Sequence, residues 1–128
     1  MIRVVRLGTA KQPGEGVRLG TVRRPPRGVR KNQYVSGGWF DVWLPNLAPS
    51  AALVASAHAA ADDRAWKRFA ARYEVEMARP DASRLLDALA ALSHQTDFSV
   101  GCYCEDESRC HRSVLKRILR KHGAQVAE

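Results

Sequence analysis

Residues 98–119 read FSVGCYCEDESRCHRSVLKRIL, and this stretch decides the fold because its hydrophobic period changes part-way along. Up to residue 104 every second side chain is apolar, which is typical of a β-strand: Phe98, Val100, Cys102 and Cys104. A helix expected over roughly 108–122 then places its apolar residues on one face: Val114, Leu115, Ile118 and Leu119. A strand, a loop and a helix in this order indicate an α/β protein.

The residues before this stretch predict further strands and helices. Strands are expected at 2–6 and 17–22, and the aromatic cluster at 39–44 should be largely buried. Helices are expected from Ser50 to about residue 60, from Asp62 or Asp63 to Pro80, and from Asp81 to a turn at 94–97. We therefore predict one domain, 1–128, with a small parallel or mixed sheet flanked by helices in a three-layer, Rossmann-like arrangement.

Composition excludes several classes of protein. The chain has 128 residues, 45% of them hydrophobic, and no apolar run approaches the roughly 18 residues of a membrane span. Its first residues, MIRVVR, do not resemble a secretory signal. Three cysteines, an odd number, are interpreted as reduced thiols, so a cytoplasmic location is expected. Because no apolar run is long enough to span a membrane, no membrane partner is expected.

Charge is concentrated at the start of the chain. Residues 1–31 carry nine basic side chains and one acid, Glu15, which accounts for the whole net charge of +8. Such asymmetry favours a positive surface for phosphate-bearing or other anionic partners. A solvated basic loop that only improves solubility explains the charge equally well.

The junction between the last strand and the last helix carries the chemistry. In an open α/β sheet, ligands bind beyond the carboxyl ends of the strands, where helix amino termini present free N–H groups. Cys110 falls at such a terminus, next to His111 and between Arg109 and Arg112. The helix dipole and the two cations both favour a thiolate there. We predict Cys110 as nucleophile or redox thiol, His111 as base or orienter, and Arg112 as anion clamp, with Arg109 in a ligand-binding role.

Two other interpretations stay open for these residues. The cysteines could simply be small buried residues of the strand and the helix edge. Alternatively Cys102, Cys104, Cys110 and His111 could bind a metal ion. The spacing disfavours a metal, because two thiols at alternate strand positions are not expected to converge, and we predict no metal ligands.

Known nucleotide and phosphate motifs are missing from the sequence. Neither the Cys-x5-Arg loop of tyrosine-phosphatase-like enzymes nor a Gly-x4-Gly-Lys-Ser/Thr loop is present. A Gly-x-Gly-x-x-Gly pattern after a strand is also absent. Ordinary ATP and dinucleotide sites are therefore unsupported, and no cofactor is expected.

Four separated motifs resemble the DUF488 family of small, mostly bacterial proteins. They are Arg27-Gly28 after two prolines, the 41–50 segment DVWLPNLAPS, Trp66-x2-Phe69-x3-Tyr73 with Glu76 beyond, and Cys110-His-Arg-Ser113. The resemblance implies an α/β three-layer fold and a site near the Cys-His-Arg segment, but no activity, because the family's function is unknown. It carries over Arg27, Asp41, Ser50, Tyr73, Cys110, His111 and Arg112, of which Arg27, Asp41 and Tyr73 are expected to bind ligand.

Pro25 and the Arg23-Arg24 pair depart from the family's pattern, so any contact that the family makes there is altered in this chain. Asp41 lies among large apolar residues and should be paired, with Arg27 or Arg30 as the natural partner. A structural ion pair explains Asp41 as well as a catalytic acid does.

The sequence supports two functions. The preferred one is an enzyme or ligand-binding protein that holds a small anionic molecule, phosphate- or nucleotide-like, between the last helix and the arginines of residues 23–30. The alternative is a nucleic-acid-binding accessory protein whose basic first quarter joins the cationic last helix. The sequence does not say which reaction is catalysed, whether the protein is an enzyme, or what its oligomeric state is.

Overall fold

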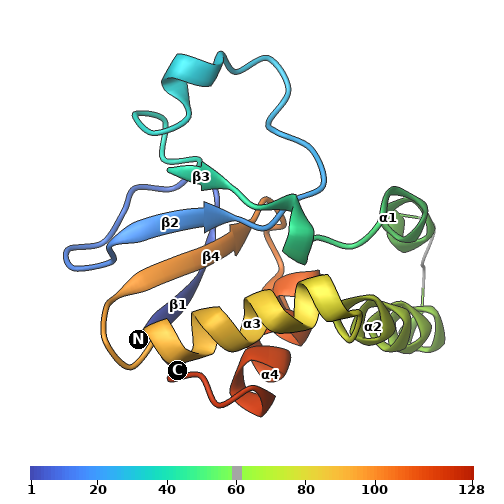
Figure 1. Ribbon diagram of the computed structural model, residues 1–128. Coiled ribbons are helices and arrows are strands. Elements are labelled where there is room, and N and C mark those ends of the chain that lie inside the picture. Colours follow the sequence, from blue (N-terminus) through green and yellow to red (C-terminus); the bar gives the residue numbers. More distant parts are fainter. Residues whose placement is uncertain (59–61) are drawn as a thin grey trace.

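The computed structural model describes residues 1–58 and 62–128 as a parallel β-sheet packed against helices (Figure 1). The strands are β1 (Ile2–Arg6), β2 (Val17–Gly20), β3 (Val42–Trp43) and β4 (Phe98–Cys102). The helices are α1 (Ala51–His58), α2 (Asp63–Met77), α3 (Pro80–Leu92) and α4 (His111–Lys121). Short 3-10 helices span Lys31–Gln33, Pro45–Leu47 and Glu107–Arg109. The expected end of the first helix, near residue 60, lies outside the described residues.

The sheet has the strand order β1-β4-β2-β3, and every pairing is parallel. β4 is therefore an inner strand, and all five of its residues are buried. This arrangement confirms the predicted α/β class and settles the sheet as parallel rather than mixed. None of the helices in the described part of the chain is both long and apolar enough to cross a membrane.

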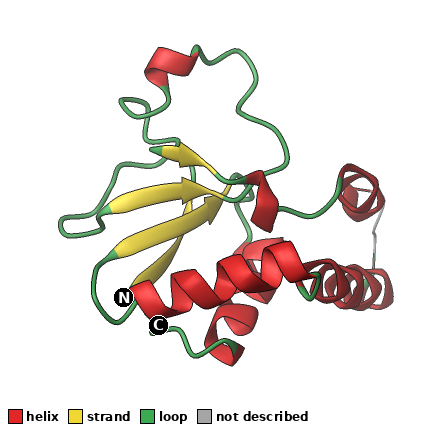
Figure 2. Cartoon of the chain, in the orientation of Figure 1, coloured by secondary structure: helices red, strands yellow, loops and turns green. Residues whose placement is uncertain are grey.

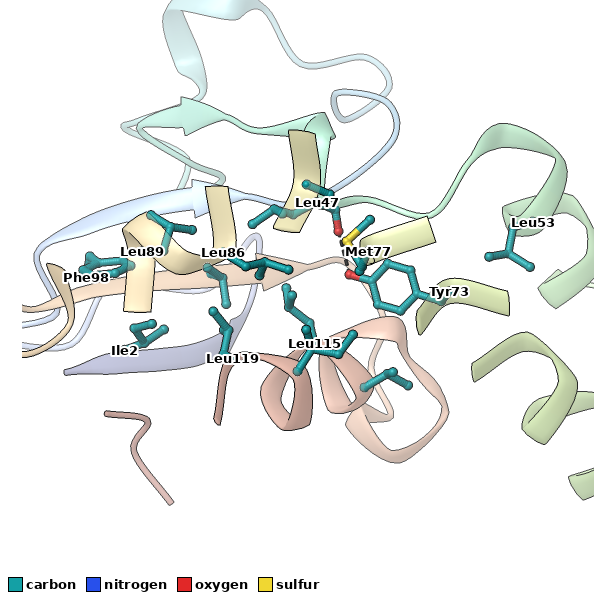
Figure 3. Close-up of a cluster of buried hydrophobic side chains, with 14 of the residues drawn as sticks. Ile2, Leu47, Leu53, Tyr73, Met77, Leu86, Leu89, Phe98, Leu115 and Leu119 are labelled. Carbon is teal, nitrogen blue, oxygen red and sulfur yellow. Dashed lines mark hydrogen bonds between the residues drawn. The ribbon is translucent and has the colours of Figure 1, made fainter. Parts of the chain in front are cut away.

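One face of the sheet carries the main hydrophobic core. Ile2, Phe98 and Val100 point from β1 and β4 into a cluster with residues of all four helices (Figure 3). The helix residues are spaced three or four apart: Phe69, Tyr73 and Met77 in α2, Leu86 and Leu89 in α3, and Leu115 and Leu119 in α4. This spacing places them on one side of each helix, as the sequence predicts. Burial of these side chains holds α4, and with it the Cys-His-Arg segment, against the end of β4.

The other face is covered by connecting segments. Figure 2 shows that a loop joins β1 to β2 and that a long loop with one short 3-10 helix joins β2 to β3. In sequence, α1, α2 and α3 lie between β3 and β4. On this face Ser99 Oγ donates to Glu15 Oε2 at 2.7 Å, and Arg18 Nε donates to the same oxygen at 2.8 Å. Glu15 and Arg18 are each only 1% exposed. The expected three-layer, Rossmann-like arrangement thus fits broadly, with loops as the third layer.

Several local predictions are confirmed by cap geometry. Asp62 Oδ1 accepts a hydrogen bond from Ala65 N at 2.8 Å at the start of α2. Ser50 Oγ accepts one from Leu53 N at 3.3 Å at the start of α1. Two other boundaries are wrong. Arg79, not Asp81, is the N-cap residue of α3, with Pro80 at its first position, and α4 begins at His111 rather than near residue 108.

The aromatic cluster at 39–44 is only partly buried. Phe40 is 3% exposed and packs over Gly20, but Val42 and Trp43 are 47% and 43% exposed. The reason is that β3 is an edge strand only two residues long, so it has a neighbour on one side alone. Leu92, expected in the buried stripe of α3, is likewise 50% exposed at the end of that helix.

Candidate functional site

Three thiols meet where β4 ends and α4 begins. Cys102 is the last residue of β4 and is 6% exposed, and Cys110 is the N-cap residue of α4 and is 1% exposed. Between them in sequence, Cys104 is exposed. Its Sγ lies 3.8 Å from the Sγ of Cys102. The structure therefore joins buried and exposed thiols in one cluster.

His111, the first residue of α4, forms the other side of the cluster. Its Nε2 lies 2.7 Å from the carbonyl oxygen of Thr21, at the end of β2. A carbonyl oxygen only accepts hydrogen bonds, so Nε2 must carry the hydrogen. The unprotonated Nδ1 lies 3.9 Å from Cys110 Sγ. Burial lowers the pKa of His111 to about 4, even though the bond to Thr21 acts in the opposite direction, so the ring is neutral at pH 7.

Arg112 turns inward beneath the loop that carries Cys104. Its side chain is 4% exposed, and its Nη2 donates to the carbonyl oxygen of Cys104 at 2.6 Å. Its Nε has no hydrogen-bond partner among the described residues. A buried donor without a partner costs about 1–3 kcal/mol, so the buried guanidinium fixes the loop at an energetic cost.

The three thiols differ in acidity because they bond to one another. Hydrogen bonds from Cys102 and then Cys110 lower the pKa of Cys104, and the nearby charge of Arg112 lowers it further. The same bonds, together with burial, raise the pKa of Cys110 far above its ordinary value. The hydrogen bond with Cys104 and burial raise the pKa of Cys102 to about 11, although the bond with Cys110 acts in the opposite direction. Of the three thiols, Cys104 is therefore the one whose thiolate form the surroundings favour.

Tyr103 ties two basic segments to this loop. Its hydroxyl donates to the carbonyl oxygen of Arg24 at 2.9 Å, which anchors the segment between β2 and β3 beside the cluster. Arg6, at the end of β1, donates from Nε to the carbonyl oxygen of Tyr103 at 3.3 Å. The ring of Tyr103 also meets the ring of Trp39 edge-on, with centroids 5.8 Å apart. Cys104 thus lies next to backbone that carries exposed arginines.

The structure changes the expected setting of Cys110 and Arg109. Cys110, predicted as the nucleophile, is closed off from solvent, because it packs against Leu7, Val22 and Phe40 in a second hydrophobic cluster. Arg109 is exposed and forms an ion pair with Asp63 of α2. Of the other residues predicted as catalytic, His111 and Arg112 are both buried beside the thiols, and the guanidinium of Arg112 donates to the Cys104 carbonyl.

The residues carried over from the resemblance lie in different places. Asp41 is paired as expected, but with Lys11 and with the backbone N–H of Arg18, at 2.7 Å, rather than with Arg27 or Arg30. Tyr73 is fully buried and donates to the carbonyl oxygen of Leu47 at 2.6 Å, with its ring edge-on to His111 at 5.5 Å. Arg27 is exposed in the loop between β2 and β3.

Sequence reasoning missed the exposed position of Cys104. We expected it to continue the alternation of the strand, but β4 ends at Cys102 and the chain turns there. The premise that Cys102 and Cys104 do not converge is therefore wrong. The run of acidic and polar residues directly after Cys104 is the signal that could have placed the strand end earlier.

A cleft of about 290 Å³ opens elsewhere, between Arg23 and the α2–α3 junction, and holds none of the cluster residues. Arg23 is not available there as an anion clamp. Its guanidinium donates to the carbonyl oxygens of Pro49, Pro45 and Ala48 at 2.9, 3.2 and 3.1 Å. Arg23 therefore holds the segment before α1 in place.

A family model described as the active DUF488-N3 subclade, DUF488-N3a, matches residues 2–123. The chain belongs to the DUF488 family. The match covers both the basic loops and the cysteine cluster of this DUF488 protein, so the resemblance seen in its four motifs is confirmed. Comparison with curated proteins and with solved structures finds no match.

Proposed function

We propose that this DUF488 protein binds a small anionic molecule, phosphate-bearing or nucleotide-like, at the carboxyl end of β4. Cys104 is the thiol that meets this molecule, and His111 and Arg112 lie behind it. The observation that carries the proposal is an exposed thiol backed by two buried thiols and by a buried arginine. The nucleophile of the proposal is Cys104 rather than Cys110, because a nucleophile must reach its substrate.

The position of the thiol supports the proposal. It lies beyond the end of an inner parallel strand, where ligands bind in open α/β sheets. The N–H groups at the start of α4 and the guanidinium of Arg112 add positive charge close to it. Exposed Arg24 and Arg27 come from the segment that Tyr103 anchors to the same loop. These features suit an anion more than a neutral ligand.

In the proposed reaction Cys104 acts as a thiolate. Its sulfur forms a bond to an electrophilic atom of the ligand, and the leaving group departs with the electron pair of the bond that breaks. His111, held by Thr21, orients Cys110, which in turn contacts Cys104. Arg112 holds the loop by its bond to the Cys104 carbonyl.

Thermal unfolding with added anions tests the binding step. Phosphate, pyrophosphate and nucleoside mono-, di- and triphosphates are each added in excess, and the expected result is that at least one raises Tm by several degrees. A ligand at 100 times its Kd contributes about 2.7 kcal/mol. The double variant Arg24→Gln and Arg27→Gln should lose this rise, while Arg120→Gln, an exposed arginine on α4, should keep it. No rise with any anion, or an unchanged rise in the double variant, contradicts the proposal.

Cys104→Ser tests the chemical step separately. It should retain the Tm rise and fail to form any covalent adduct or product with the anion that binds. Loss of adduct formation in Cys110→Ser but not in Cys104→Ser would identify Cys110, rather than Cys104, as the nucleophile.

A further inference from the structure

All three cysteines of the chain meet beside one imidazole. The ligand atoms of Cys102, Cys110 and His111 lie within 4.8 Å of one another, and all three residues are buried. Cys104 Sγ lies 3.8 Å from Cys102 Sγ and also contacts Cys110. The proposed reaction takes place at Cys104 alone, so the convergence of two further thiols and an imidazole behind it needs its own explanation.

The separations fit a tetrahedral metal ion. Zinc binds cysteine sulfur at about 2.3 Å and histidine nitrogen at about 2.0–2.1 Å, so neighbouring ligand atoms lie about 3.6–3.8 Å apart. The pair Cys102–Cys104 is separated by 3.8 Å and the pair Cys110 Sγ–His111 Nδ1 by 3.9 Å. The other pairs among Cys102, Cys110 and His111 lie within 4.8 Å and would close slightly around an ion. Cys104 would turn toward His111 to complete the set.

The imidazole of His111 is already set for a metal. Its Nε2–H donates to the Thr21 carbonyl, which fixes both the ring orientation and the tautomer. The lone pair of Nδ1 is thereby left on the side of Cys110. Histidines that bind metal ions almost always donate their second nitrogen to a carbonyl, carboxylate or water in this way.

The charge of the surroundings also fits. Three thiolates, one neutral imidazole and a divalent cation sum to one negative charge. Arg112 lies directly next in the chain, is buried, and keeps one guanidinium N–H without a partner among the described residues. Its positive charge would neutralise the site as a whole. A buried site with a net negative charge is stabilised by a positive side chain beside it.

We propose that Cys102, Cys104, Cys110 and His111 bind one zinc-like divalent metal ion through three sulfurs and Nδ1. Exposed Cys104 is the ligand on the solvent side, so the ion can reach the site there. The inference does not depend on the proposed function. It is compatible with that function, since a thiolate bound to a metal can still attack an electrophile.

Cobalt titration tests the proposal directly. Reduced, chelator-treated protein is titrated with Co²⁺, and the absorption of tetrahedral cobalt and of thiolate-to-cobalt charge transfer is recorded. We expect saturation at one equivalent per chain and complete displacement by Zn²⁺. Zn²⁺ should also raise the Tm of the wild-type protein, because a ligand that binds only the folded state stabilises it. Absence of both signals in the wild-type protein overturns the proposal.

Variants identify the ligands. Cys102→Ser, Cys110→Ser and His111→Gln should each weaken Co²⁺ binding by at least about tenfold. Cys104→Ser should keep one equivalent but lose part of the charge-transfer intensity. His122→Gln is the matched control. His122 pairs with Asp87 at the far end of α4, so this variant should bind Co²⁺ as the wild type does. Equal binding in Cys110→Ser and the wild type, or a loss in His122→Gln, overturns the assignment. An unchanged spectrum in Cys104→Ser overturns its place as the fourth ligand.

Discussion

The sulfur atoms at the end of β4 differ chiefly in how much solvent they meet. Cys102 and Cys110 are 6% and 1% exposed, and Cys104, two residues beyond the strand, is exposed. A thiol reacts with a reagent in solution only when its sulfur is reached, whatever its acidity. Position in the fold, more than residue type, therefore separates the three cysteines.

Alkylation should distinguish them. Iodoacetamide, added in the presence of a chelator, should label Cys104 in the folded protein and should label Cys102 and Cys110 only after denaturation. Mass spectrometry of the peptides measures the label at each cysteine. Labelling of Cys110 at the rate of Cys104 would contradict the burial described above.

Glu15 shows what burial does to a carboxylate. Burial by itself raises its pKa, but hydrogen bonds from Arg18 and Ser99 outweigh this and lower the pKa from 4.5 to about 2. A pKa that is lower in the folded state adds stability above the unfolded pKa, and this stability is lost as the pH falls toward the folded pKa. The shift corresponds to about 3 kcal/mol at neutral pH.

Glu15→Gln should therefore destabilise the protein by about 3 kcal/mol at pH 7, because it leaves the charge of Arg18 buried without a counter-charge. Urea unfolding measured from pH 7 to pH 2 should show a steeper loss of stability in the wild type than in the variant, chiefly below pH 4.5. Glu105→Gln is the control. Its ion pair with Arg6 is exposed, so its effect should stay below about 1 kcal/mol.

At the scale of the elements, the loop between β1 and β2 determines how the second face of the sheet is closed. Gly16 has a φ of +79°, and a Cβ there would lie 2.0 Å from the carbonyl oxygen of Asp97. Gly14 has a φ of +76° but meets nothing within 4 Å. The two glycines share a left-handed backbone and differ in their surroundings, so they separate conformational strain from steric overlap.

Gly14→Ala should cost about 1–2 kcal/mol, the strain of a left-handed residue with a Cβ. Gly16→Ala should cost at least about 1–3 kcal/mol more, because backbone atoms must move to admit the methyl group. Urea or thermal unfolding of the two variants gives the difference. Equal losses would mean that the approach of Gly16 to Asp97 is not as close as described.

Tyr73 links two elements through one hydroxyl group. Its bond to the Leu47 carbonyl joins α2 to the 3-10 helix before α1, in a fully buried position. Tyr73→Phe should lower the free energy of unfolding by about 1–2 kcal/mol, since it leaves that carbonyl unpaired. Tyr34→Phe, in the half-buried loop between β2 and β3, is the control and should change stability by less than about 0.5 kcal/mol. Chemical denaturation of both variants measures the difference.

At the scale of the whole molecule, the net charge is +8, but many of the basic side chains already have partners within the fold. Exposed ion pairs join Arg6 to Glu105, Arg109 to Asp63 and Arg117 to Glu74. Near the start of the chain, Arg18 and Arg23 donate hydrogen bonds to carbonyl oxygens, and Arg18 also forms an ion pair with Glu15. Fewer free cations remain for phosphates than the composition implies.

We therefore expect weak binding to nucleic acid. A gel-shift series with DNA and RNA should show no retention at about 150 mM salt, because binding that rests on few phosphate contacts weakens quickly with salt. Tight binding at that salt concentration would favour the nucleic-acid-binding alternative over a small anionic ligand.

Much of the fold follows from the sequence alone. The alternation at 98–102, the stripe Phe69, Tyr73 and Met77, and the cap at Asp62 are local patterns, each set by a few neighbouring residues. Local patterns are readable because the periods of strands and helices differ. The α/β class and the junction that carries the Cys-His-Arg segment were predictable for this reason.

Only the tertiary structure decided which thiol is exposed, which partner Asp41 takes and which nitrogen of His111 carries a hydrogen. Each depends on residues distant in sequence: Leu7 and Phe40 over Cys110, Lys11 beside Asp41, Thr21 under His111. Parallel strands bring such segments together through long connections, and nothing in the local sequence records their register. The chemistry of the cluster is therefore a property of the sheet order, not of the motif.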